Sequence, residues 1–235
     1  MKGNQIPFKK NMIQGTALVL AALVLGIFMV CTVKTLKSYD DTVKVRGLCE
    51  KEVPADRVVW RINYNEKSNS LADLRAMVRE HNDIIVKKLR DAGFTDDEIK
   101  VANANYEDRY TYASNTSTIT FRYNVSQAIT VFTKNLDLVR KMQQTLETDL
   151  VNQNILANSW ADYQYLGLND IKPSMIAESL ENARTAADEF AKNSHSRIGK
   201  MRTASQGYFE VEDLDENTPQ VKKVRVVTTV EYYLK

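Results

Sequence analysis

The chain has 235 residues and a formal net charge of +2, from 32 basic and 30 acidic side chains. The excess of positive charge comes from Lys2, Lys9 and Lys10, because residues 34–235 carry 29 basic and 30 acidic side chains. A near-neutral domain lacks the basic surface that nucleic acid requires, so no nucleic-acid binding is expected. The length suffices for one large domain or two small ones.

An apolar segment near the N-terminus predicts a membrane anchor. No charged residue occurs between Asn11 and Val33, where the core reads TALVLAALVLGIFMVCTV. This core is longer than the apolar part of a cleavable signal peptide, and about 20 apolar residues cross a bilayer as a helix. We therefore expect a cytoplasmic N-terminus over residues 1–11, a transmembrane helix in the lipid bilayer over 12–33, a spacer over 34–42 and an exterior domain over 43–235.

The charges that flank the apolar segment predict its orientation. Three lysines precede it, whereas only Lys34 and Lys37 follow it closely. The positive-inside rule then places the N-terminus in the cytoplasm and the larger domain outside it. Cys49 is the only thiol of that domain, so it cannot form a disulfide within it. Two alternatives remain for Cys49, a thiol buried on a strand or a bridge between two molecules.

Two alternating segments open the exterior domain. The first, TVKVRGL, ends its alternation at Gly47, and the second, RVVWRINY, places Val58, Trp60, Ile62 and Tyr64 on one face. Alternation with period two predicts strands. The polar stretch EKEVPAD lies between them and contains Pro54, which cannot donate a ladder hydrogen bond. We expect it to be the connection between the two strands.

Three amphipathic helices are predicted further along. The first covers residues 70–93, with Ser70 as its N-cap and Gly93 just beyond its last turn. The second covers 136–150. The third covers 173–193, with Pro173 in its first turn. Its buried face is expected to contain Ile176, Leu180, Ala183, Ala187 and Phe190.

The remaining alternating segments predict five more strands, over residues 99–110, 119–133, 160–168, 198–211 and 221–234. The strand over 119–133 is long, so a bulge or bend is expected near Ser126 and Gln127. The element order is ββαββαβαββ. It predicts an α+β fold with a mixed, largely antiparallel sheet or sheets and the three helices on one face, preceded by the transmembrane helix.

The sequence contains no recognisable catalytic, cofactor or metal-binding motif. His81 lies on the apolar face of the first helix, where we expect a packed histidine, and His195 follows the third helix. Acidic neighbours Glu50 and Glu52 disfavour a reactive thiolate at Cys49. We therefore predict no catalytic residue, no cofactor and no metal site, and expect that the protein is not an enzyme.

The stretch VKVRGLCEKEVPADRVVWRI resembles the start of the SIMPL domain family, on Gly47, Pro54, Ala55 and Asp56. The likeness continues through AGFTDDEIKVANANYEDRY, LGLNDIKPSMIAESLENARTAADEFA and VRVVTTVEYYL, and covers about residues 42–234. Family members are mostly bacterial envelope proteins, secreted or membrane-anchored, and the resemblance implies no catalytic residues. Here NSHSR replaces a glycine that the family often has after its third helix.

The resemblance gives the expected location and role. We expect a single-pass protein of the bacterial cytoplasmic membrane, with its C-terminal domain in the periplasm or otherwise outside the cytoplasm. It is expected to act as a structural or interaction protein that forms homo-oligomers, with a link to envelope or oxidative stress. The alternative is a monomeric binding module for a small envelope ligand or a partner protein.

Overall fold

The computed structural model describes residues 20–29, 32, 41–111, 113 and 116–235. The chain divides into two compact units. Unit 1 contains the chain up to Cys49, together with Ser174–Phe209 and Val226–Lys235, and unit 2 contains Glu50–Pro173 and Glu210–Arg225. The predicted cytoplasmic N-terminus and all but the last two residues of the predicted spacer lie outside the described residues.

Only part of the predicted anchor is described. Residues 20–29 form a helix whose large apolar side chains are exposed, with Phe28 74% exposed. Within the described part of the chain, no helix reaches the length and hydropathy of a membrane span. The rest of the predicted anchor, apart from Thr32, lies outside that part.

Unit 2 contains a five-stranded sheet with the order β3-β5-β2-β6, and β4 pairs with β5 beside β3. Its strands are β2 (Arg57–Ser68), β3 (Ile99–Val101), β4 (Asn105–Asp108), β5 (Tyr123–Thr133) and β6 (Ala157–Gln164), and all their pairings are antiparallel. The register between β2 and β5 is unbroken from Val58–Thr133 to Ser68–Tyr123. The predicted bulge near Ser126 is therefore wrong; the strand is shorter than predicted, beginning at Tyr123.

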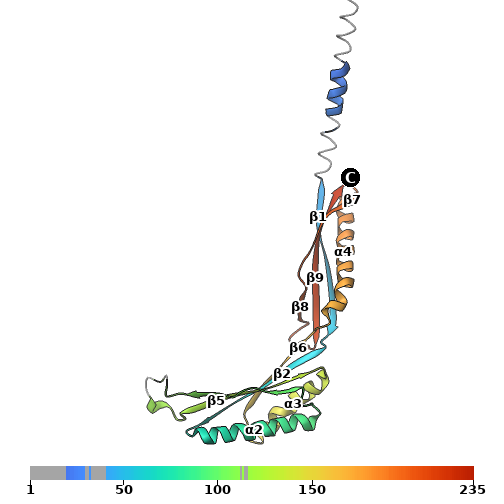
Figure 1. The fold of residues 1–235 in the computed structure, drawn as a ribbon. Helices are drawn as coiled ribbons and strands as arrows, with labels where there is room; N and C mark the ends of the chain where they lie inside the picture. The colour runs from blue at the N-terminus through green and yellow to red at the C-terminus, as the bar shows by residue number, and fades with distance from the viewer. Residues whose placement is uncertain (1–19, 30–31, 33–40, 112, 114–115) are drawn as a thin grey trace, which may run out of the picture. The chain divides into compact units, whose positions relative to one another are not determined.

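Helices α2 (Leu71–Ala92) and α3 (Leu136–Val151) cover one face of this sheet (Figure 1). Their caps follow from the sequence. The Ser70 hydroxyl accepts a hydrogen bond from the N–H of Asp73 at 3.3 Å, and Gly93 adopts a left-handed conformation with φ 114°. Both features were predicted, because an oxygen side chain satisfies an unpaired helix N–H and glycine adopts positive φ without strain.

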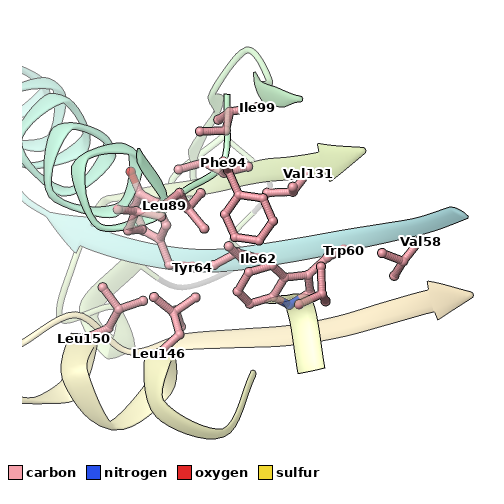
Figure 2. Packing of buried hydrophobic residues seen from close by; sticks show 14 of the residues in the cluster. Val58, Trp60, Ile62, Tyr64, Leu89, Phe94, Ile99, Val131, Leu146 and Leu150 are labelled. Carbon is pink, nitrogen blue, oxygen red and sulfur yellow. The ribbon is translucent and has the colours of Figure 1, made fainter. Parts of the chain in front are cut away.

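The core of unit 2 lies between the sheet and these two helices. Figure 2 shows Trp60, Ile62 and Tyr64 of β2 facing the helices, where they are at most 1% exposed. The predicted alternation on β2 is thus confirmed. The Trp60 ring packs on Phe94 with centroids 6.1 Å apart, and Leu146 and Leu150 of α3 complete the contact. Such large side chains dominate the stabilisation of a core.

A second sheet has the order β1-β9-β7, with β8 also paired to β9. These strands are β1 (Thr42–Pro54), β7 (Ile198–Gln206), β8 (Glu210–Asp213) and β9 (Val221–Leu234). In unit 1, helix α4 (Leu168–Asn193) packs on this sheet through Ala183 and Ala187, which contact Val45, Val230 and Tyr232 (Figure 1). The prediction of three helices on one face is therefore wrong, because α4 covers a different sheet from α2 and α3.

The buried face of α4 contains Ala183 and Ala187 as predicted, but its other residues differ from the prediction. Phe190 is 63% exposed, and the buried positions recur every four residues at Met175, Ser179, Ala183, Ala187 and Ala191. Small residues along this stripe let the helix backbone lie close to the strands. A hydrophobicity pattern alone places Phe190 inside, whereas the structure buries Ala187 and Ala191 in this part of the helix.

Several element boundaries also differ. Strand β1 continues past Gly47 to Pro54, so the connection to β2 is shorter than EKEVPAD. The predicted strands over 99–110 and 198–211 are each divided in two, as β3 with β4 and β7 with β8. Helix α4 begins at Leu168, so Pro173 lies inside it rather than in its first turn, and β6 ends at Gln164. A short 3₁₀ helix, η1 (Thr116–Thr118), precedes β5.

Candidate functional site

The four family residues fall into two places in the fold. Pro54, Ala55 and Asp56 form the corner between β1 and β2 in unit 2. Gly47 lies within β1 in unit 1. The structure therefore does not bring the four residues together in one site, and each place is described separately.

Hydrogen bonds to the backbone fix the corner. Ala55 is 7% exposed, and its N–H donates to the carbonyl of Gln220 at 2.8 Å. The carboxylate of Asp56 accepts hydrogen bonds from the N–H of Leu166, at 2.9 and 3.0 Å, and of Gly167, at 2.9 Å. These two amides directly precede α4. Asp56 thus ties the corner to the start of that helix, because a carboxylate is a strong acceptor for unpaired N–H groups there.

Gly47 permits the close approach of β1 and α4. A Cβ atom at this position would lie 1.8 Å from the carbonyl oxygen of Ser179 and 2.5 Å from the backbone nitrogen of Ala183. No side chain fits in that space, so the glycine is required by packing. Two residues further along β1, Cys49 is 2% exposed and forms no disulfide among the described residues. Its burial agrees with the first alternative for this thiol and opposes a bridge to a second molecule.

A small cavity adjoins the corner within unit 2. Its volume is about 350 Å³, and its lining contains Pro54, Lys134, Asn135, Leu136, Asp137, Arg140, Tyr163, Gln220 and Val221. Burial raises the pKa of Tyr163, so its hydroxyl stays protonated at neutral pH and can donate a hydrogen bond. Arg140 is held by Asp137 at 3.1 Å. These groups can orient a small polar ligand.

A larger groove of about 710 Å³ lies between α2 and the strands β3 and β4. Val86, Val101 and Tyr106 supply its apolar surface. Arg75, Arg79 and Lys87 also line it, together with Val78, Asn82, Asp83 and Arg90. Positive charge beside an apolar surface suits an anion with an apolar part. The groove is therefore a second candidate binding surface.

The open edge of β7 is the third candidate surface. Residues 200–208 are all exposed, and Tyr208, just beyond the strand, is 94% exposed. Within the described sheet β7 pairs only with β9. The stretch from Thr203 to Phe209 carries no charged residue and no proline. Unpaired backbone groups on such an edge are available to another strand.

The other sheet edges carry features that oppose pairing with a second molecule. Charged side chains occur along β1, at Lys44, Arg46, Glu50, Lys51 and Glu52. The edge strands β3, β4 and β8 have three or four residues each. Strand β6 carries Asp162. Charge, short length and irregular register are the usual protection of an edge strand. Strand β7 has nine residues, and its charged residues and register shifts lie before Thr203.

One histidine packs against the core of unit 2, and the other ends the helix α4 region with an unusual backbone conformation. Nδ1 of His81 lies 3.2 Å from Oε1 of Glu66, and its ring packs edge-to-face on Tyr64 with centroids 5.7 Å apart. This agrees with the predicted packed histidine. His195 follows α4 with φ 55°, in the left-handed region that favours glycine. Among the described residues, no group of three His, Cys, Asp or Glu side chains is placed to hold a metal.

One polar cluster was not predicted. Arg122 forms a two-pronged ion pair with Asp108, at 2.7 to 3.1 Å, and lies over the rings of Tyr110 and Tyr123 at 5.2 and 4.9 Å. Its hydrogen bonds hold the pKa of Asp108 below the usual range. Asp108 ends β4 and Arg122 directly precedes β5, and these two strands pair with each other. A prediction of this strand pairing would have placed the two side chains together.

These features define an α+β protein of two units whose candidate sites are a strand edge, a groove and a small cavity. Residues 43–232 match the SIMPL family, described as a protein of unknown function (DUF541). Because the match covers most of the chain, the protein belongs to the SIMPL family. Comparison with curated proteins gives no match for this chain.

Proposed function

We propose that this protein is a membrane-anchored interaction protein of the bacterial envelope, which acts by self-association and not by catalysis. Its domains would lie outside the cytoplasm, on a single-pass anchor in the cytoplasmic membrane. The uncharged segment over residues 12–33 and the lysines before it support this arrangement. The exposed apolar side chains of residues 20–29 support it too, since such a surface needs lipid or protein to cover it.

The observation that carries self-association is the open, uncharged edge of β7. A soluble protein that avoids pairing through such an edge normally places lysine, proline or a bulge on it. From Thr203 to Gln206 the strand has no lysine or proline, and its register with β9 is regular. The edge is therefore suited to accept another strand.

Anchoring would strengthen a weak contact of this kind. Molecules confined to one membrane surface meet at a high effective concentration, so a small interface can assemble them. The family resemblance supports a role in envelope or oxidative stress, which a deletion strain would test through its sensitivity to peroxide.

The proposal is tested by the molar mass of the full chain in mild detergent, measured by light scattering with and without reductant. We expect an oligomer that survives reductant, because burial of Cys49 disfavours a bridge from this thiol to a second molecule. A monomer at high micromolar concentration would overturn the proposal. An oligomer that dissociates on reduction would show that a disulfide, and not the strand edge, joins the molecules.

A second candidate function is binding of a small ligand by a monomer. The cavity of about 350 Å³ beside Pro54 favours it, because its size lies at the lower end of small-molecule sites. Tyr163 and Lys134 would supply the polar contacts. A Tyr163→Phe variant should then lose ligand-induced thermal stabilisation in a screen of small anions. If no anion stabilises the wild-type protein, this second function fails.

A further inference from the structure

The hydrogen bonds of β7 show which backbone groups face its open edge. The N–H of Gly207 donates to the carbonyl of Val227 at 2.8 Å, so Gly207 faces β9. In an antiparallel strand, alternate residues direct both backbone groups to the same neighbour. Thr203 and Ser205 therefore face β9 as well. The N–H and C=O groups of Ala204 and Gln206 point to the open edge.

From this pattern we propose that β7 pairs with β7 of a second copy, antiparallel, about a two-fold axis at Ser205. The inference rests on the proposed self-association and names the contact that produces it. In this register Ala204 of each copy lies opposite Gln206 of the other. Both residues face outward, so each such pair exchanges two N–H···O bonds. Ser205 of one copy lies opposite Ser205 of the other, in a pair without hydrogen bonds.

The charges near the edge agree with this register. A residue at a two-fold axis lies opposite the same residue of the second molecule. A charged residue at the axis would therefore face a like charge. Residues 203–209 are uncharged, and Lys200 and Arg202 lie to one side of the axis. Each Arg202 then lies opposite the segment at Tyr208 of the other copy. Arginine beside an exposed tyrosine is a favourable contact and is common at interfaces.

The proposed register makes a sharp prediction for cysteine cross-linking. Opposed residues in a pair without hydrogen bonds have Cα atoms about 4.5 Å apart, within the range that a disulfide spans. The Ser205→Cys variant should therefore form a covalent dimer. Thr203→Cys is the matched control. The backbone groups of Thr203 face β9, as those of Ser205 do, but Thr203 lies opposite Gly207 of the second copy and not opposite another Thr203.

The experiment uses the full chain in mild detergent, with Cys31→Ser in every variant and mild oxidation before a non-reducing gel. We expect at least about tenfold more covalent dimer for Ser205→Cys than for Thr203→Cys, since only the first brings two thiols together. Equal cross-linking of both variants, or more for Thr203→Cys, would overturn the register.

The molar mass of the unmodified chain shows whether the protein self-associates at all, independently of whether β7 is the contact. If the wild-type chain is an oligomer and Ser205→Cys does not cross-link, the strand pairing is wrong while self-association stands. If the wild-type chain is a monomer and neither variant cross-links, self-association itself fails. Circular dichroism of each variant shows whether the fold is retained, and Ser205→Ala, which should leave the mass unchanged, controls for loss of the hydroxyl.

Discussion

Replacing Gly47 with alanine should strongly destabilise the packing of α4 on β1. The added Cβ would lie 1.8 Å from the carbonyl oxygen of Ser179, whereas real Cβ contacts are essentially never under 3.0 Å. The helix or the strand must therefore move by roughly 1 Å. Ser179 and Ala183 are fully buried, so this movement opens a close-packed contact.

The size of the effect follows from two losses. Overpacking against a rigid neighbour costs about 1–3 kcal/mol. The shift also strains the buried hydrogen bond between the hydroxyls of Ser179 and Thr228, 2.7 Å apart, and leaving such groups unpaired costs about 1–3 kcal/mol. Gly47→Ala should thus lose about 2–6 kcal/mol, a large part of the stability of a typical domain.

Urea and thermal unfolding of the full chain, followed by circular dichroism, would measure this loss. Gly167→Ala is the matched control, since the atoms nearest its Cβ would be the hydroxyl oxygen of Tyr165, at 3.1 Å, and the ring of Tyr165, at 3.2 Å, and a side chain can move aside where backbone cannot. We expect that control to cost less than about 1 kcal/mol. A free energy of unfolding for Gly47→Ala within about 0.5 kcal/mol of the wild-type value would show that the glycine is not required by packing.

Three other changes test the described contacts. Asp56→Asn replaces one of two acceptor oxygens with a donor and should cost about 1–3 kcal/mol in urea unfolding; an unchanged midpoint would show that the corner does not need the carboxylate. His195→Gly should gain up to about 1 kcal/mol, because glycine adopts positive φ without strain, and a loss of stability would contradict this reading. The folded-state pKa of Asp108 lies below its unfolded value, so its pairing with Arg122 stabilises the protein at neutral pH and is lost as the pH falls below about 4. Asp108→Asn should therefore reduce the difference in stability between about pH 7 and pH 3, and an unchanged difference would argue against this pair.

Features set by local chemistry were predictable from the sequence. Ser70 and Gly93 mark the two ends of α2, because a capping oxygen and a left-handed glycine each act on the adjacent turn of the helix. The alternation of Trp60, Ile62 and Tyr64 identifies the buried face of β2, because period two is a property of any strand. The SIMPL family was also recognisable, from the order of several weak motifs along the chain.

Features set by contacts between distant segments were not predictable. Gly47 was interpreted as the end of a strand, because the backbone of Ser179 that excludes a side chain is far away in sequence. Phe190 was placed inside, because the side of α4 that contacts the strands, at Ala187 and Ala191, depends on how distant segments pack. The open edge of β7 was not predictable for the same reason, because it too depends on contacts between distant segments. An edge is defined by which strand lacks a neighbour, and strand pairing over long separations leaves little trace in one sequence.

The most direct test of self-association compares the molar mass of the wild-type chain with that of Ser205→Lys, by light scattering in mild detergent at several concentrations. Lysine at the proposed axis would face lysine of the second copy, and like charges directly opposite destabilise a strand pair. We predict a discrete wild-type oligomer and a Ser205→Lys chain that dissociates at lower dilution while keeping its circular dichroism spectrum. A wild-type chain that remains a monomer at high micromolar concentration would contradict the account.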